Sequence, residues 1–194
     1  MSISLKYNIS GKRVLWFFML TNLIYIFMLA VTIPKTMVFS KGLKLLDMMP
    51  MGYSAQYIKT LFDTLGEEGR NVYLYNQIPV DMIYPGLFAI SYFFLMGYFL
   101  HKFQKLNPSY FLLTLLPVLA GIADYLENFG IVTMIYNYPE LSELSMNLTN
   151  IFTIVKSVVT TIFFAVLIGT LFILGVITLK EIKKKTFYRN KAQR

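Results

Sequence analysis

Four long apolar runs dominate this sequence and most constrain what it can fold into. They cover about residues 14–33, 82–100, 110–136 and 150–179. Roughly 20 apolar residues in a helix cross the hydrocarbon core of a bilayer, so each run is long enough to span it. The sequence therefore predicts an all-α, polytopic membrane protein. Residues 1–194 would form a single membrane domain built as a four-helix transmembrane bundle.

Composition supports a membrane setting and excludes several kinds of chemistry. Of 194 residues, 56% are hydrophobic and only 14% are charged, whereas soluble domains carry about 25% charged residues. The net charge of +8 lies mostly at the chain ends and beside the apolar runs, so we expect no nucleic-acid partner. The absence of cysteine excludes disulfides and thiolate chemistry, and a single histidine, His101, excludes a multi-histidine metal site. We expect no metal and no cofactor.

The segment 34–80, between the first two runs, is predicted to form a helical cap. Ser54 is a candidate N-cap for an amphipathic helix, and Gly66 is its expected C-terminal stop. A second short helix is expected near residues 72–78. The pattern fits either a pair of membrane-surface helices or a lid over a pocket. Pro34 is expected to end the first span, and Pro85 is expected in the first turn of the second.

Basic residues predict the orientation. The N-terminal residues, the turn at 101–108 and the C-terminal tail are basic, whereas the 136–149 connection is acidic and the 34–80 segment is balanced. Connections rich in Lys and Arg stay in the cytoplasm. Both termini are therefore predicted to be cytoplasmic and the cap extracytoplasmic. The first run lacks a small-residue cleavage pattern, so we expect it to be retained.

The third apolar run carries Asp124, Glu127 and Asn128 near its middle. Their spacing of three and four residues places all three side chains on one face of a helix. Ionisable groups inside a span are costly in lipid and usually face protein or water at a functional site. This face is the first candidate binding site.

Lys156 in the fourth run is the expected partner of Glu127. Each residue lies about nine residues, roughly 13 Å, from the same end of its helix, and the short connection between the helices makes them neighbours. Asp81 and Tyr84 begin the second run at that surface, and Arg70 is a candidate for the rim. Together these residues predict an outward-open polar pocket. With Asp124, Glu127 and Lys156, its net charge is expected to be about −1 if both acids are ionised and about zero if burial keeps one of them protonated.

Three functions remain open on this basis. The first is binding of a lipid headgroup or small amphiphile by Asp124, Glu127, Asn128, Lys156, Arg70, Asp81 and Tyr84. The second is an intramembrane acid–base enzyme acting on a lipid, with Asp124 or Glu127 as catalytic group; the sequence does not decide whether the protein is an enzyme. The third is a structural or accessory subunit of a larger membrane complex, in which the polar residues only orient helices. Membrane lipids are the expected partners, beside a membrane-protein partner or a homodimer.

Four short motifs occur in order between residues 34 and 160. They are Gly52-Tyr53-Ser54, Leu65-Gly66-x-x-Gly69-Arg70-x-x-Tyr73, Asp81-x-x-Tyr84-Pro85 and Asp124-x-x-Glu127-Asn128. This order resembles a group of uncharacterised four-span bacterial membrane proteins. The resemblance implies a bacterial inner-membrane setting and brings no activity with it. The turn from Asp47 to Tyr53, which is rich in Met, is predicted to serve packing.

Overall fold

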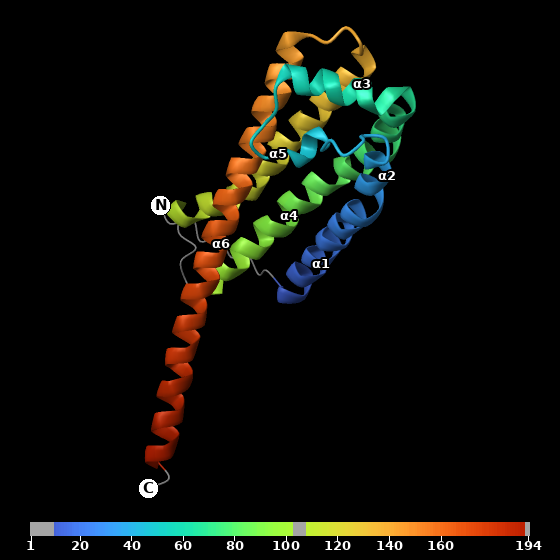
Figure 1. The fold of residues 1–194 in the computed structure, drawn as a ribbon. Coiled ribbons are helices and arrows are strands. Elements are labelled where there is room, and N and C mark those ends of the chain that lie inside the picture. The colour runs from blue at the N-terminus through green and yellow to red at the C-terminus, as the bar shows by residue number, and fades with distance from the viewer. Residues whose placement is uncertain (1–9, 103–107, 193–194) are drawn as a thin grey trace.

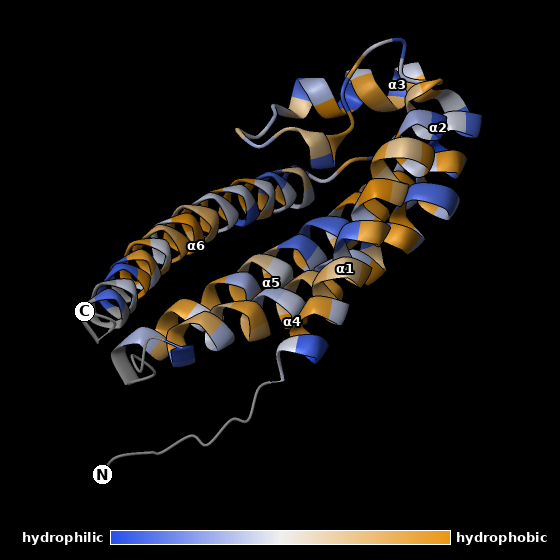
Figure 2. Cartoon of the chain, turned by 90° about the horizontal axis from the view of Figure 1, so that it is seen from below, coloured by the Kyte–Doolittle hydropathy of each residue, from blue (hydrophilic) through white to orange (hydrophobic). Residues whose placement is uncertain are grey.

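Helices make up all the regular structure of the part of the chain that the computed structural model describes, residues 10–102 and 108–192. Four helical stretches, Gly11–Met37, Ala55–Lys102, Tyr110–Asn137 and Glu143–Lys184, are long and apolar enough to cross a membrane. Figure 2 shows the hydrophobic residues that run along these helices. This confirms the predicted all-α class with four candidate spans. The elements are α1 (Gly11–Phe27), the π-helical turn η1 (Met28–Thr32), α2 (Ile33–Met37), the 3-10 turn η2 (Leu46–Met48), α3 (Ala55–Val72), the π-helical turn η3 (Tyr73–Gln77), α4 (Ile78–Lys102), α5 (Pro108–Asn137) and α6 (Glu143–Ala192).

The long helices follow one another in space as they do in sequence. Helix α1 packs against α4, α4 against α5, and α5 against α6 (Figure 1). Helices α1 and α6 lie at the two edges of this arrangement and barely contact each other. The space between these two helices, here called the crevice, holds the two cavities described below.

One end of the bundle, here called the loop end, is covered by residues 38–54 and by α3, which crosses it (Figure 1). Leu45, Leu46, Ile58, Leu61 and Phe62 are buried there in one apolar cluster with residues of η3 and α5. This cluster anchors the cap to the ends of the long helices.

The predicted N-cap of the amphipathic helix is confirmed, whereas Gly66 kinks the helix instead of ending it. The Tyr57 N–H donates to Ser54 Oγ at 3.1 Å, which caps α3. Gly66 interrupts the helix with a φ of +63°, a conformation that glycine adopts readily. The chain then resumes a helical path to Val72 and continues through η3 into α4.

Two predictions about proline are wrong. Pro34 does not end the first helical stretch, which continues to Met37. The π-helical turn η1 lies directly before Pro34, and the helical path passes the proline through this local change of hydrogen-bond pattern. Pro85 lies inside α4 rather than in its first turn, because α4 already begins at Ile78.

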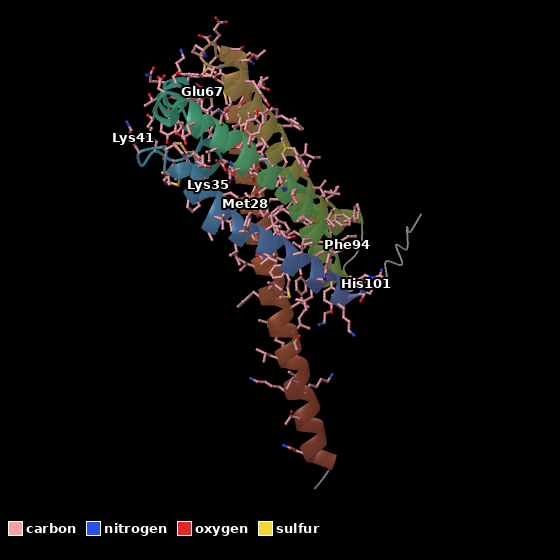
Figure 3. All side chains as sticks on the ribbon, turned by 90° about the vertical axis from the view of Figure 1, so that its right-hand side faces the viewer. Met28, Lys35, Lys41, Glu67, Phe94 and His101 are labelled. Atoms are coloured by element: carbon pink, nitrogen blue, oxygen red, sulfur yellow. The ribbon has the colours of Figure 1, made fainter. Side chains whose placement is uncertain are left out.

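The end opposite the loop end carries basic residues. Lys12 and Arg13 at the start of α1 and Lys102 at the end of α4 are exposed, as are Lys183 and Lys184 on α6. Figure 3 shows His101 at this end and Lys35, Lys41 and Glu67 at the loop end. Helix α6 projects far beyond its neighbours (Figure 1), as expected for a helix longer than a bilayer requires.

Candidate functional site

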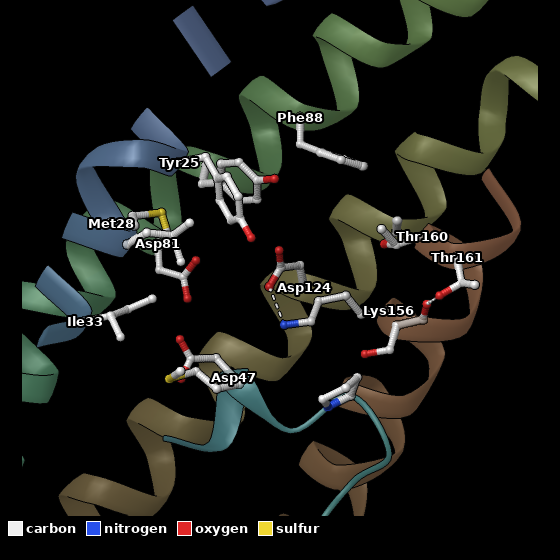
Figure 4. Close-up of a pocket in the computed structure, with 16 residues that line it drawn as sticks. Tyr25, Met28, Ile33, Asp47, Asp81, Phe88, Asp124, Lys156, Thr160 and Thr161 are labelled. Atoms are coloured by element: carbon white, nitrogen blue, oxygen red, sulfur yellow. Dashed lines mark hydrogen bonds and ion pairs between the residues drawn. The ribbon is translucent and has the colours of Figure 1, made fainter. Parts of the chain in front are cut away.

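A cavity of about 450 Å³, here called the chamber, lies between α1 and α6 near the loop end. Its wall comes from α1 and η1, the loop around η2, and the facing sides of α4, α5 and α6. Carboxylates of Asp47, Asp81 and Asp124 and the Lys156 ammonium point into it (Figure 4). Ser157, Thr160 and Thr161 extend its polar wall along α6, and Tyr25, Tyr84 and Phe88 supply aromatic rings.

Lys156 joins α6 to α5 through two carboxylates. Its Nζ lies 3.2 Å from Asp124 Oδ1 and also forms an ion pair with Glu127. The pairing of Lys156 with Glu127 expected from their depths is present. Asp124 faces the chamber, whereas Glu127 is fully buried behind Lys156 and does not line the cavity. Glu127 therefore influences the chamber by holding the Lys156 ammonium in place.

A short series of hydrogen bonds connects this pair to the loop. Thr153 Oγ1 donates to Glu127 Oε1 at 2.8 Å, and the Tyr53 hydroxyl lies 3.0 Å from Thr153 Oγ1. When Thr153 donates to Glu127, Tyr53 donates to Thr153. Burial raises the pKa of the Tyr53 phenol above its usual value. Tyr53 thus stays neutral and is a fixed contact between loop and bundle.

Asp47 is the acid that sequence reasoning missed, since its turn was expected to serve only packing. Asp47 Oδ1 accepts a hydrogen bond from the Tyr73 hydroxyl at 2.8 Å, and Asp47 Oδ2 accepts one from Gln77 Nε2 at 3.2 Å. Both donors lie on η3, and Gln77 also contacts the Thr32 hydroxyl of η1. These donors hold the Asp47 carboxylate at the chamber.

Asp81 is the chamber acid without a partner. Its residue is only 4% exposed, and among the described residues no hydrogen bond or ion pair involves its carboxylate. One turn along α4, the Tyr84 ring stacks on Tyr25 of α1 with centroids 5.4 Å apart. Both of these predicted site residues, Asp81 and Tyr84, therefore lie in the chamber wall.

Asn128 is brought next to the site but does not line it. Its Nδ2 donates to the backbone oxygen of Asp81 at 3.1 Å. That oxygen would normally accept the N–H four residues later, and position 85 is a proline without an N–H. The side chain of Asn128 replaces the missing helical bond and fixes α5 against α4 at the level of Asp81.

Arg70 is not brought to the chamber. Its Nη1 donates to the Phe62 carbonyl oxygen at 2.7 Å, and its guanidinium lies 4.2 Å from the centre of the Tyr138 ring. Tyr138 in turn donates to Asp63, and this hydrogen bond raises the pKa of the Tyr138 phenol. Arg70 therefore connects α3 to the segment between α5 and α6, within the cap.

A second cavity of about 600 Å³, here called the groove, lies between α1, α4 and α6 toward the basic end. Its lining is apolar apart from two tyrosine hydroxyls: Gly11, Val14, Leu15, Phe18, Tyr92, Leu95, Tyr98, Phe99, Phe164, Leu167 and Leu171. Phe88 of the chamber and Tyr92 of the groove are packed together, with ring centroids 4.7 Å apart. An aromatic layer thus separates the two cavities along one crevice.

No protein-family model, curated protein or solved structure matches this chain. Within residues 10–102 and 108–192, no group of three or more His, Asp or Glu side chains is arranged to hold a metal ion. The chemistry of the chamber therefore rests on its own geometry: several carboxylates, one ammonium and aromatic rings inside an apolar bundle.

Proposed function

We propose that this chain is a multi-pass membrane protein that binds a lipid or other small amphiphile. The headgroup occupies the chamber, and the hydrocarbon chain passes between α1 and α6 over the aromatic layer of Phe88 and Tyr92 to lie in the groove. The observation that carries the proposal is that both cavities lie between α1 and α6, polar near the loop end and apolar toward the basic end. An amphiphile has the same order of polarity along its length.

Access from the bilayer supports this assignment. The two helices on either side of the crevice barely contact each other, and several lining residues remain accessible, including Leu15 at 57% exposure. A hydrocarbon chain lying between α1 and α6 would cover apolar surface, at roughly 25 cal/mol per Å². The headgroup would meet the polar groups of the chamber without crossing a closed helix interface.

Native mass spectrometry of the purified protein tests the proposal. We expect one lipid-sized molecule to be retained by the wild-type protein. Ser157→Trp should fill the chamber and Leu15→Trp the groove, so each should lose that molecule. The matched controls are Val158→Trp on α6 and Leu23→Trp on α1, whose side chains are exposed and line neither cavity. Equal retention by all four variants would contradict the proposal, and a stoichiometric protein partner would favour the accessory-subunit alternative.

The orientation is part of the proposal: the loop end faces the exterior of a bacterial inner membrane and both termini face the cytoplasm. The basic residues at the opposite end support it. Because the chain contains no cysteine, single-cysteine variants carry no background. A membrane-impermeant maleimide should label Met51→Cys, at the 89% exposed loop position, on intact cells, and should not label Lys184→Cys. The reverse labelling would overturn the orientation.

Acid–base catalysis on a bound lipid is the second candidate. The observation that favours it is the hydrogen-bonded series from Tyr53 through Thr153, Glu127 and Lys156 to Asp124 at the chamber. Such a series can hold the Asp124 carboxyl in place as a general acid or base toward a bound molecule. Incubation with a bacterial lipid extract, followed by mass spectrometry, should then show a product that Asp124→Asn fails to form. An unchanged extract would count against catalysis.

A further inference from the structure

We infer that the chamber selects an amphiphile with a positively charged headgroup, a single-chain alkylammonium in its simplest form. This inference rests on the proposed function and specifies its ligand class. It starts from the charges that meet in and behind the chamber. Four carboxylates, those of Asp47, Asp81, Asp124 and Glu127, lie around one ammonium, that of Lys156.

Three of these acids have hydrogen-bond or ion-pair partners, and Asp81 has none among the described residues. Lys156 forms ion pairs with both Asp124 and Glu127. Asp47 accepts hydrogen bonds from Tyr73 and Gln77. Asp81 is left with no hydrogen-bond donor and no ion pair from the described residues, although it is 4% exposed and its carboxylate points into the cavity (Figure 4).

An unpaired buried carboxylate is costly, and a cation that pairs with it and donates hydrogen bonds offsets that cost. A bound ammonium group would donate hydrogen bonds to Asp81 and lie among the acids of the chamber. The stacked pair Tyr25 and Tyr84 lines the same cavity, and aromatic rings attract ammonium groups. A headgroup carrying a carboxylate or phosphate as its only charge would instead face several like charges.

The backbone holds Asp81 at this position independently of any ligand. Asn128 donates a hydrogen bond to the Asp81 carbonyl oxygen. One turn further along α4, Gly121 allows α5 to approach closely, since a Cβ at position 121 would lie 2.8 Å from the Pro85 oxygen. The free carboxylate is therefore presented by a rigid part of the α4–α5 contact. Rigid presentation lowers the ordering cost of binding.

Four probes with defined charge and length test the inference, each titrated by native mass spectrometry of the full chain in a nonionic detergent. Dodecylamine, dodecanol and dodecanoate share a chain and differ in charge, whereas butylamine keeps the ammonium and lacks the chain. We expect dodecylamine to bind on the order of tenfold more tightly than dodecanol, equivalent to about 1.4 kcal/mol. Dodecanoate and butylamine should bind more weakly than both.

Asp81→Asn keeps the shape of the side chain and removes its charge. It should reduce dodecylamine affinity at least to that of dodecanol and leave dodecanol binding unchanged. The control is Asp63→Asn, on an exposed residue of the cap. The comparison of the four probes on the wild-type protein needs no variant and stands even if Asp81→Asn fails to fold.

The outcomes separate this inference from the proposed function. If the wild-type protein binds dodecylamine no better than dodecanol, while Ser157→Trp abolishes both, the amphiphile site stands and its preference for a cation is overturned. If Asp81→Asn behaves like Asp63→Asn, the preference is also overturned. If no dodecyl probe binds, or if Ser157→Trp leaves binding intact, both the inference and the proposed function fail.

Discussion

The side-chain amide of Asn128 donates a hydrogen bond, at 3.1 Å, to the Asp81 backbone oxygen that Pro85 leaves without a helical partner. A helix inside a membrane has no water to satisfy such an oxygen. The neighbouring helix supplies the donor instead. This relationship explains why an asparagine lies beside the acids of α5 and why a proline is tolerated inside α4.

A double-mutant cycle tests this role. Asn128→Ala should destabilise the protein by about 1–3 kcal/mol, because a buried acceptor loses its donor. In a Pro85→Ala background the new N–H can bond to the Asp81 oxygen, so the same Asn128→Ala change should cost less. Thermal unfolding midpoints of the four proteins in one detergent give the coupling. Strictly additive effects would contradict the proposed replacement of the helical bond.

The second prediction concerns the shared ammonium of Lys156. Lys156→Met removes the positive charge from Asp124 and Glu127 and should cost about 3–5 kcal/mol, the usual effect of stripping one partner from a buried pair. Adding Glu127→Gln and Asp124→Asn removes the stranded charges, so the triple variant should regain stability. Unfolding midpoints measure both steps. A triple variant less stable than Lys156→Met would show that the lysine does more than neutralise these acids.

Much of this arrangement could be predicted from the sequence. Apolar length predicts the four spans, and equal depth in antiparallel neighbours predicts Lys156 beside Glu127, because both depend on helical rise alone. Asp47 could not be placed in this way. It lies in an irregular segment, and its position depends on Tyr73 and Gln77, donors on a π-helical turn. The position of Arg70 could not be predicted for a related reason. Its partners, Phe62 and Tyr138, are brought to it by tertiary packing of the cap.

The third prediction isolates the donor of Asp47. Tyr73→Phe removes the hydroxyl that donates to Asp47 and should destabilise the protein by about 1.5–3 kcal/mol, as expected for a hydrogen bond to a charged group. Tyr57→Phe is the matched control, since its hydroxyl donates to the Lys44 carbonyl at an exposed site. Its effect should be smaller. Equal shifts in the unfolding midpoints would argue against a special role for the Asp47 contact.

The fourth prediction separates backbone strain from steric overlap at two loop glycines. Gly52 has a φ of +82°, and a Cβ there would lie 2.5 Å from Asn150 Oδ1 and 2.9 Å from Ile154 Cδ1. Gly42 has a φ of +90° with nothing within 4 Å. Gly42→Ala should therefore cost about 1–2 kcal/mol from its conformation alone, and Gly52→Ala should cost about 1–3 kcal/mol more from overlap. Limited proteolysis of the loop reports the difference, and similar cleavage of both variants would contradict the predicted overlap.

The fifth prediction follows from the raised pKa of Tyr53. The fold favours the neutral phenol, so the contribution of Tyr53 to stability is fully present below the unfolded pKa of about 10 and is lost as pH rises above it through the folded pKa. Tyr53→Phe lacks the hydroxyl and its hydrogen bond to Thr153. The wild-type protein should therefore be the more stable by about 1 kcal/mol at neutral pH.

That difference should shrink above about pH 10, because burying an ionised phenol destabilises only the wild-type protein. Unfolding midpoints of both proteins across this range measure it, and Tyr57→Phe provides the comparison for a tyrosine of α3 whose hydroxyl makes an exposed hydrogen bond. A gap between wild-type and Tyr53→Phe proteins that widens with pH would mean that the Tyr53 hydroxyl is not held neutral. The contact between the loop and α6 would then depend on the Tyr53 backbone N–H, which donates to Asn150 Oδ1 at 2.8 Å.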